Sequence, residues 1–93
     1  MSESTILTAV EGFADWSKPW RFLEAVLTHA DLSAEDRMVV RAIWADTCNA
    51  AHWSERQLFD GSEAASQALK AAHPWLSLIA RTHFIRAAAH EWQ

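Results

Sequence analysis

Five histidines and one cysteine are the residues of this 93-residue sequence best suited to chemistry, so their spacing is the first test for a metal or catalytic site. Metal sites on helices usually place two ligands three or four residues apart, as in His-x-x-x-His or Glu-x-x-His. Neither pattern occurs, and the nearest approaches are His52 with Glu55, in reversed order, and His83 with His90, seven residues apart. We therefore expect no bound metal and no cofactor, and surface or interface roles for the histidines.

Cys48 is the single cysteine, which excludes a disulfide within the chain and leaves one candidate thiol nucleophile. Its spacing from Trp44 places both residues on the apolar face of a predicted helix, and burial raises the pKa of a thiol and makes it unreactive. No serine lies in the glycine-rich pattern of a nucleophile elbow, and no glycine-rich loop is present to hold a phosphate. The sequence therefore predicts that the protein is not an enzyme.

The distribution of charge bears on the class of partner. The formal net charge is −4, and residues 1–63 hold eleven acids and five bases, whereas residues 64–93 hold one acid and three bases. Nucleic-acid binding requires a clustered basic surface that displaces counterions from phosphates, so we expect no nucleic-acid partner. Because the apolar runs are short and the first residues polar, we expect no membrane span, no signal peptide and a cytoplasmic location.

The composition predicts an all-α protein, because residues that break helices are scarce. The sequence contains eighteen alanines, six tryptophans, two glycines and two prolines, too few turn residues for a β-sandwich or barrel. Apolar residues recur at helical spacing, as in the series Ile6, Ala9, Val10, Phe13. We predict one domain over residues 1–93, a bundle of four to five helices at approximately 4–14, 18–30, 34–60, 62–73 and 74–91.

The helix predicted over 34–60 has a clear start and two possible continuations. Ser33 can cap it, and Asp36 in its first turn interacts favourably with the helix dipole. The helix either runs unbroken to residue 60, or breaks at His52-Trp53 and restarts through a capping box at 54–57. In both cases Gly61 is expected to follow its last turn.

The helix predicted over 74–91 is apolar on nearly every side. One series of its residues has steps of three and four, the spacing of a coiled-coil seam. The series consists of Trp75, Leu78, Thr82, Ile85, Ala89 and Trp92. A helix that is apolar all round is buried from several directions. It is therefore either the central helix of the bundle or a helix shared with a second copy. For the second case, the predicted homodimer interface consists of Trp75, Leu78, Ile85 and Trp92.

The tryptophans divide into two groups. Four lie on predicted core stripes, namely Trp20, Trp44, Trp75 and Trp92. Trp16 lies between two predicted helices, and Trp53 projects away from the core stripe if helix 34–60 is unbroken. Because tryptophan and arginine are enriched at binding hot spots, we predict a partner-binding patch of Trp53, Arg56, Phe59, Met38 and Trp16. The alternative is that the helix breaks and the Trp53 ring folds inward.

A second candidate patch is a cationic stripe at helical spacing, formed by His83, Arg86 and His90. The alternative explanation for this stripe is a solvated helix face.

The segment 22–26, Phe-Leu-Glu-Ala-Val, followed by 30–35, Ala-Asp-Leu-Ser-Ala-Glu, resembles the passage from helix one to helix two of the colicin-type immunity proteins. These are small acidic four-helix proteins that bind and silence a nuclease toxin. The resemblance covers a small part of the chain, and the paired tyrosines that contact the toxin have no counterpart, since the sequence lacks tyrosine. The family serves as one example of what such a scaffold can do, and no family is assigned.

The leading hypothesis from the sequence is a small non-enzymatic helical module that binds another protein, such as a regulator, inhibitor or immunity-type protein. A surplus of large apolar residues on helices without a clean polar face supports it. The alternative is a ligand-binding module in which Trp and Phe side chains enclose an apolar molecule and a histidine orients it. A third hypothesis is a metal-dependent enzyme built on His52, Glu55, His83 and His90.

Overall fold

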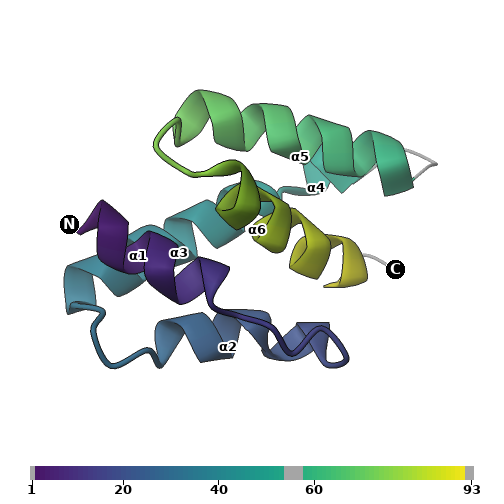
Figure 1. Ribbon diagram of the computed structural model, residues 1–93. Helices are drawn as coiled ribbons and strands as arrows, with labels where there is room; N and C mark the ends of the chain where they lie inside the picture. Colours follow the sequence, from purple (N-terminus) through teal and green to yellow (C-terminus); the bar gives the residue numbers. More distant parts are fainter. Residues whose placement is uncertain (1, 54–57, 92–93) are drawn as a thin grey trace.

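The computed structural model describes residues 2–53 and 58–91, without the side chains of 50, 51 and 58–60, and within these ranges the chain is helical with no strand (Figure 1). The elements are α1 (Glu3–Glu11), a 3-10 turn η1 (Pro19–Arg21), α2 (Phe22–Leu27), α3 (Ala34–Thr47), α4 (Ala50–Trp53), α5 (Leu58–Ala72) and α6 (Leu78–Glu91). The predicted all-α bundle is confirmed. None of the helices in the described part is both long enough and apolar enough to cross a membrane.

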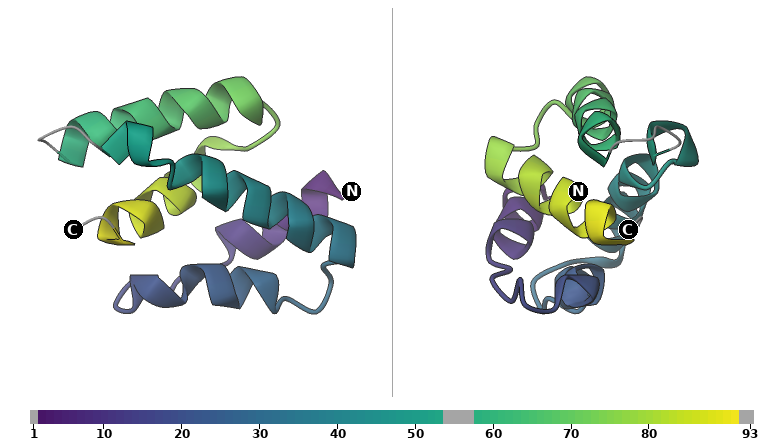
Figure 2. Two further views of the ribbon diagram at one scale, coloured as in Figure 1. Left: turned by 180° about the vertical axis from the view of Figure 1, so that it is seen from behind. Right: turned by 90° about the vertical axis from the view of Figure 1, so that its right-hand side faces the viewer.

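Helix α6 lies at the centre of the bundle. It packs against α1, α3, α5 and η1, and the right-hand view of Figure 2 shows α5 above it and α1 and α2 below it. Its buried residues are Ala80, Phe84, Ala87 and Ala88. The last helix thus has the predicted central position within the chain, and its small side chains allow close approach of its neighbours.

The start of α3 is held by the predicted cap. The Ser33 hydroxyl accepts a hydrogen bond from the Asp36 backbone N–H (3.0 Å), and the Asp36 carboxylate accepts from the Ser33 N–H (3.1 Å). The same carboxylate accepts from the Ser2 N–H (2.8 Å), which ties the start of α1 to α3. These backbone donors, Ser2 first, hold the pKa of the Asp36 carboxyl below its usual range.

The prediction of a single helix over 34–60 is wrong, and the break falls before His52-Trp53, the position given in the alternative. Helix α3 ends at Thr47 with Cys48 as its C-cap, and α4 begins at Ala50. The turn is held by Trp53, whose indole N–H donates to the Thr47 carbonyl (2.8 Å). Trp53 is therefore folded inward and buried. The predicted capping box at 54–57 lies outside the described residues.

Gly61 does not end a helix, contrary to the prediction, but lies inside α5, which begins at Leu58 rather than at 62. A Cβ atom at Gly61 would lie 2.6 Å from Cε3 of Trp53 and 3.0 Å from the backbone oxygen of His52. Glycine is needed here because α4 and the Trp53 ring lie directly against α5.

Helix α6 begins at Leu78, four residues after the predicted start. Ser77 caps it: the Ser77 hydroxyl accepts from the Ala80 N–H (3.1 Å) and donates to the Glu11 carboxylate (2.8 Å). Trp75 therefore lies in the turn that precedes the helix, off its seam. The other predicted ranges are also shortened, since α1 ends at Glu11 and α2 at Leu27.

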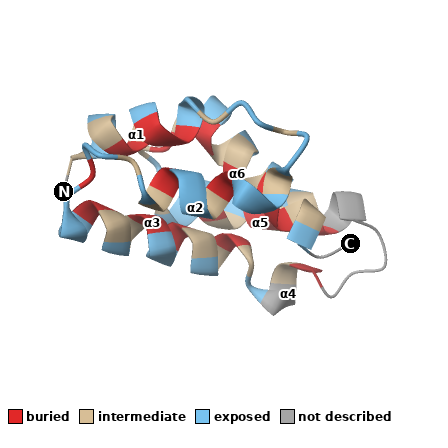
Figure 3. Ribbon diagram, turned by 90° about the horizontal axis from the view of Figure 1, so that it is seen from below, coloured by how far each residue is buried: buried red, intermediate tan, exposed pale blue. Residues whose placement is uncertain are grey.

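Figure 3 shows how burial follows these helices: buried residues line the faces turned toward the centre, and the outer faces of α2 and α3 are exposed. The buried side chains of the described residues form two clusters. The larger joins α1, α2, α3, α5 and α6, and the smaller consists of Trp53, Ala65 and Ala88.

Candidate functional site

Aromatic rings meet around Phe22, which is fully buried at the start of α2. The ring centroids of Phe84 and Phe13 lie 5.3 and 5.4 Å from it, both in edge-to-face arrangements, and Trp16 stacks on it at 5.9 Å. Such pairs contribute about 0.5–1.5 kcal/mol beyond the burial of their area. This cluster anchors the segment between α1 and α2 to the core.

Trp16 also covers part of the cationic stripe on α6. Its ring lies 4.3 Å from the Arg86 guanidinium carbon and 5.1 Å from the His83 ring. His83 in turn bonds through Nδ1 to the Val10 carbonyl (2.9 Å), and His90 lies against Trp20 (5.7 Å). The structure thus joins two separately predicted candidates, Trp16 and the stripe, in one contact within the molecule. The alternative of a fully solvated stripe is wrong for His83.

The described members of the predicted partner-binding patch lie in different surroundings. Trp53 is 9% exposed, so the expectation that it projects away from the core is wrong. Met38 is 69% exposed on the outer side of α3, and Trp16 is half-buried in the aromatic cluster. Arg56 lies outside the described residues, and so does the side chain of Phe59. The role of all five residues in binding a partner stays a prediction.

The predicted homodimer interface is not a continuous seam. Trp75 and Ile85 are half-buried and pack against the large core cluster, whereas Leu78 is 68% exposed; Trp92 lies outside the described residues. The side of α6 turned away from the core carries exposed residues that we call the outer face of α6: Leu78, Ile79, Thr82 and Arg86. Trp20, predicted to lie in the core, is 60% exposed.

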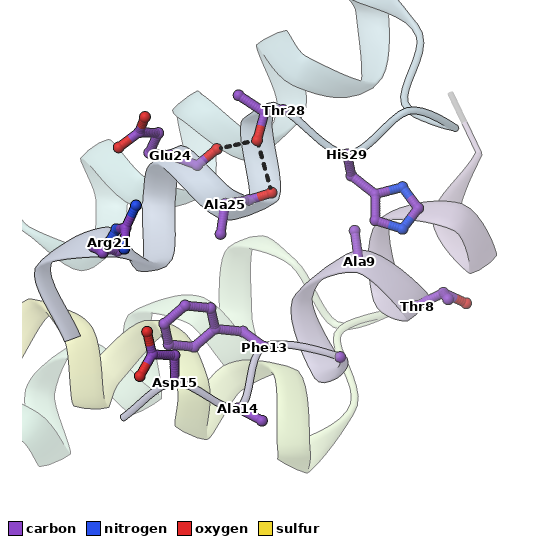
Figure 4. Close-up of a pocket in the computed structure, with 11 residues that line it drawn as sticks. Thr8, Ala9, Phe13, Ala14, Asp15, Arg21, Glu24, Ala25, Thr28 and His29 are labelled. Carbon is purple, nitrogen blue, oxygen red and sulfur yellow. Dashed lines mark hydrogen bonds between the residues drawn. The ribbon is translucent and has the colours of Figure 1, made fainter. Parts of the chain in front are cut away.

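A groove of about 650 Å³ separates α1 from α2. Helix α2 packs mainly on α3 and η1, and α1 mainly on α6, and the groove lies between them. One wall consists of Thr8, Ala9, Gly12, Phe13, Ala14 and Asp15, and the other of Arg21, Glu24, Ala25, Thr28 and His29 (Figure 4). Sequence reasoning missed this site. Its one signal was a set of small residues on two consecutive predicted helices, Ala9, Gly12, Ala14 and Ala25.

The polar side chains of the groove lie toward its two ends. Asp15, Arg21 and Glu24 lie at one end, and His29 and Thr8 at the other (Figure 4). The Asp15 carboxylate accepts from the Ser17 hydroxyl (2.7 Å). Within the described residues, no hydrogen bond or ion pair holds the side chain of Arg21 or Glu24. Their charges are therefore free to interact with a ligand.

The side chains that could do chemistry are held in structural contacts. Cys48 is half-buried, and burial, with a smaller contribution from the charge of Glu91, raises the pKa of its thiol to about 11. His73 bonds through Nε2 to the Asp46 carboxylate (2.7 Å) and joins the end of α5 to α3. Over residues 2–53 and 58–91, no three His, Cys, Asp or Glu side chains are grouped so that they could hold a metal ion.

The described residues therefore offer two surfaces that could bind a partner or ligand: the outer face of α6, and the groove between α1 and α2. The two do not share a residue. Comparison of the chain with protein-family models, with curated proteins and with solved structures finds no match.

Proposed function

We propose that this protein is a small helical interaction module that binds another protein through the outer face of α6. The observation that carries the proposal is the exposure of two large apolar side chains in consecutive positions at the start of this helix, Leu78 at 68% and Ile79 at 56%. Full burial of a leucine or isoleucine side chain contributes about 1.5–3 kcal/mol. A partner that covers the exposed parts of both residues therefore gains about 2–4 kcal/mol from their burial.

The position of α6 supports this proposal, because a rigid surface loses little entropy on binding. The helix is held by α1, α3, α5 and η1, and the Ser77–Glu11 hydrogen bond fixes its first turn. One helical turn beyond the apolar pair lie Thr82 and then Arg86, both exposed. An apolar centre beside polar residues is the usual anatomy of a protein–protein interface.

The accessible surface supports binding by an already folded chain. The protein exposes 5446 Å², and a folded monomer of its mass is expected to expose about 5,400 Å². A partner is therefore not needed to complete the core. This favours a complex of two folded components over an obligate dimer in which a second copy completes the core.

The test compares a variant in which Leu78 and Ile79 are both replaced by serine with Met38→Ser, which removes the exposed α3 residue of the predicted partner-binding patch. Because all three side chains are more than half exposed, both variants are expected to melt like the native protein. We expect one protein to co-purify with the native chain and with Met38→Ser, and to be lost from the double variant; loss from Met38→Ser alone would instead place the binding surface on α3.

Light scattering over a dilution series decides whether that partner is a second copy. A dimer that the double variant abolishes identifies the partner as the chain itself. A partner that the double variant retains refutes the outer face of α6 as the binding surface. A chain that is monomeric and recovers nothing refutes the function.

A second candidate function, the binding of a small ligand, is supported by the groove between α1 and α2. Its volume of about 650 Å³ lies in the range of small-molecule sites, which are lined by apolar and aromatic side chains with a few polar groups. Phe13 supplies the aromatic wall, and His29 lies at one end. Perturbation of groove amides in nuclear magnetic resonance spectra by a small-molecule library tests this function; a library that perturbs none of them rules it out.

A further inference from the structure

We propose that the groove between α1 and α2 binds a small organic ammonium ion, a molecule with a positively charged head and an apolar body about the size of one ring. The inference rests on the second candidate function, ligand binding in the groove, and specifies the chemical class of the ligand. It does not depend on the outer face of α6.

The shape of the groove fits an apolar body of this size. Its walls carry short side chains, Ala9 and Ala14 on one side and Ala25 on the other, which leave space between the helices. The Phe13 ring is held on its core side by edge-to-face contacts with Trp16 and Phe22 (4.9 and 5.4 Å). Its remaining surface faces the groove (Figure 4), where a ligand ring can cover it.

The charged end of the groove favours a cation. Asp15 on one wall and Glu24 on the other supply two carboxylates against the single guanidinium of Arg21. Gly12, the C-cap of α1, also lines the groove, so the negative end of the helix dipole lies at this site. An ammonium head at this end of the groove is attracted by two carboxylates and repelled by one guanidinium, whereas for a carboxylate ligand this balance of charge is reversed.

The opposite end of the groove offers a hydrogen-bond donor. His29 Nδ1 accepts a hydrogen bond from the Asp31 backbone N–H (3.3 Å), so the neutral ring carries its proton on Nε2. Figure 4 shows the ring beside Ala9 and Thr8, away from Asp15. A hydroxyl or carbonyl group on the far side of the ligand can accept from this nitrogen. The preferred ligand therefore has an ammonium group at one end and a hydrogen-bond acceptor at the other.

The experiment titrates the full chain, labelled with ¹⁵N, with three probes: phenethylamine, tyramine, which adds a hydroxyl group, and phenylacetate, which replaces the ammonium head by a carboxylate. We expect both amines to shift the amides of groove residues, and phenylacetate to bind more weakly. Tyramine is expected to bind more tightly than phenethylamine in the native protein and not in His29→Leu.

Charge variants sharpen the test. Asp15→Asn and Glu24→Gln are each expected to weaken amine binding by about threefold, and Arg21→Gln to strengthen it by a similar factor, because these groups are exposed and solvent screens them. Glu3→Gln and Arg41→Gln change the net charge equally at exposed positions outside the groove, so they are expected to leave the affinity unchanged.

The outcomes separate this inference from the function on which it rests. If phenylacetate binds in the groove more tightly than the amines, or if Arg21→Gln weakens amine binding, ligand binding stands and the preference for a cation is wrong. If the control variants change the affinity as much as the groove variants, the amines bind through net charge and the site is refuted. If none of the probes shifts groove amides, the inference is refuted, and the library screen decides whether the groove binds any other ligand.

Discussion

The two buried clusters of this protein pack in opposite ways. Around Phe22, large rings interlock with centroid separations of 5.3–5.9 Å. Around Trp53, one buried ring lies against Gly61, Ala65 and Ala88, with Trp44 and Ile85 packed at the margin. The first cluster is filled by interlocking large side chains, whereas the second relies on small residues that let α4, α5 and α6 approach closely. Truncation is therefore expected to be most costly in the first cluster, and enlargement in the second.

Phe84→Ala is expected to have the largest effect. Phe84 is fully buried on the central helix and meets Phe22 edge to face, so its truncation leaves a cavity and removes a ring contact. We expect the free energy of unfolding to fall by about 4 kcal/mol, or about a thousandfold in the folding equilibrium, in urea titrations. Phe84→Leu serves as the control and is expected to cost far less. A loss below about 1 kcal/mol for Phe84→Ala would show that the cluster repacks.

The reactivity of Cys48 tests how far water is excluded around the second cluster, because its side chain packs against that cluster. Since burial raises the pKa of the thiol to about 11, against 9.0 for an unperturbed thiol, the thiolate fraction near pH 8 is about a hundredfold lower. We expect alkylation by iodoacetamide to be slowed by about this factor relative to the urea-unfolded chain, and the rate to rise up to about pH 11. A folded thiol that titrates at or below pH 9 would contradict the burial.

Gly61→Ala tests the close packing itself. The added Cβ would lie 2.6 Å from the Trp53 ring and 3.0 Å from the His52 carbonyl oxygen, so α4 and α5 must move apart. We expect a loss of about 2 kcal/mol, or about thirtyfold, visible as a lower thermal midpoint. The loss is expected to shrink in a Trp53→Phe background, where the ring is smaller. An equal loss in both backgrounds would assign the clash to the His52 backbone alone.

Arg86→Met tests whether the contact between Arg86 and the Trp16 ring stabilises the fold. The guanidinium carbon lies 4.3 Å from the centre of the Trp16 ring, and an exposed contact of this kind contributes about 0.5–1 kcal/mol. We expect a loss of that size in urea titrations, and none for Arg41→Met on the outer face of α3. If the two variants lose equally, the contact with Trp16 adds nothing beyond a surface charge.

Asp36 belongs to neither cluster and provides the smallest expected effect, a change in the slope of stability against pH. Because its pKa is lowered in the folded state by the N–H groups of Ser2 and Ser33, it stabilises the fold above the unfolded value of 3.8 and ceases to do so as the pH falls through its folded pKa. Asp36→Asn is expected to flatten the acid limb of the stability curve, and Glu3→Gln to leave it unchanged. Parallel acid limbs for the native protein and Asp36→Asn would exclude this contribution.

Sequence reasoning succeeded where a feature depends on residues close together in the chain, and failed where it depends on contact with a distant segment. The start of α3 was predictable because a capping box needs only Ser33 and residues within one turn of it, and the buried stripe of Val40, Ile43 and Thr47 follows from helical periodicity. Gly61 was misread because its low helix propensity is a local property, whereas its position inside α5 depends on the ring of Trp53 from another helix.

The candidate sites were less predictable than the fold. Trp53 and Met38 share the sequence character of contact residues, yet one is buried and the other exposed. The groove was missed because it lies between two helices whose separation is set by their packing on other helices, and no local pattern encodes that separation. Leu78 was singled out for its place in a heptad seam, but its exposure arises because the core of α6 lies on the opposite side, along Ala80, Phe84 and Ala87.

What the sequence determined by itself is the set of local properties: helices throughout, the cap at Ser33, and an apolar environment for Cys48. These depend on backbone propensity and on residues one or two turns apart. The tertiary structure alone decided where α3 breaks, that Trp53 turns inward, that Trp16 covers His83 and Arg86, and that α1 and α2 leave a groove between them. Each of these depends on distant segments competing for the same space around α6, and local patterns do not record that competition.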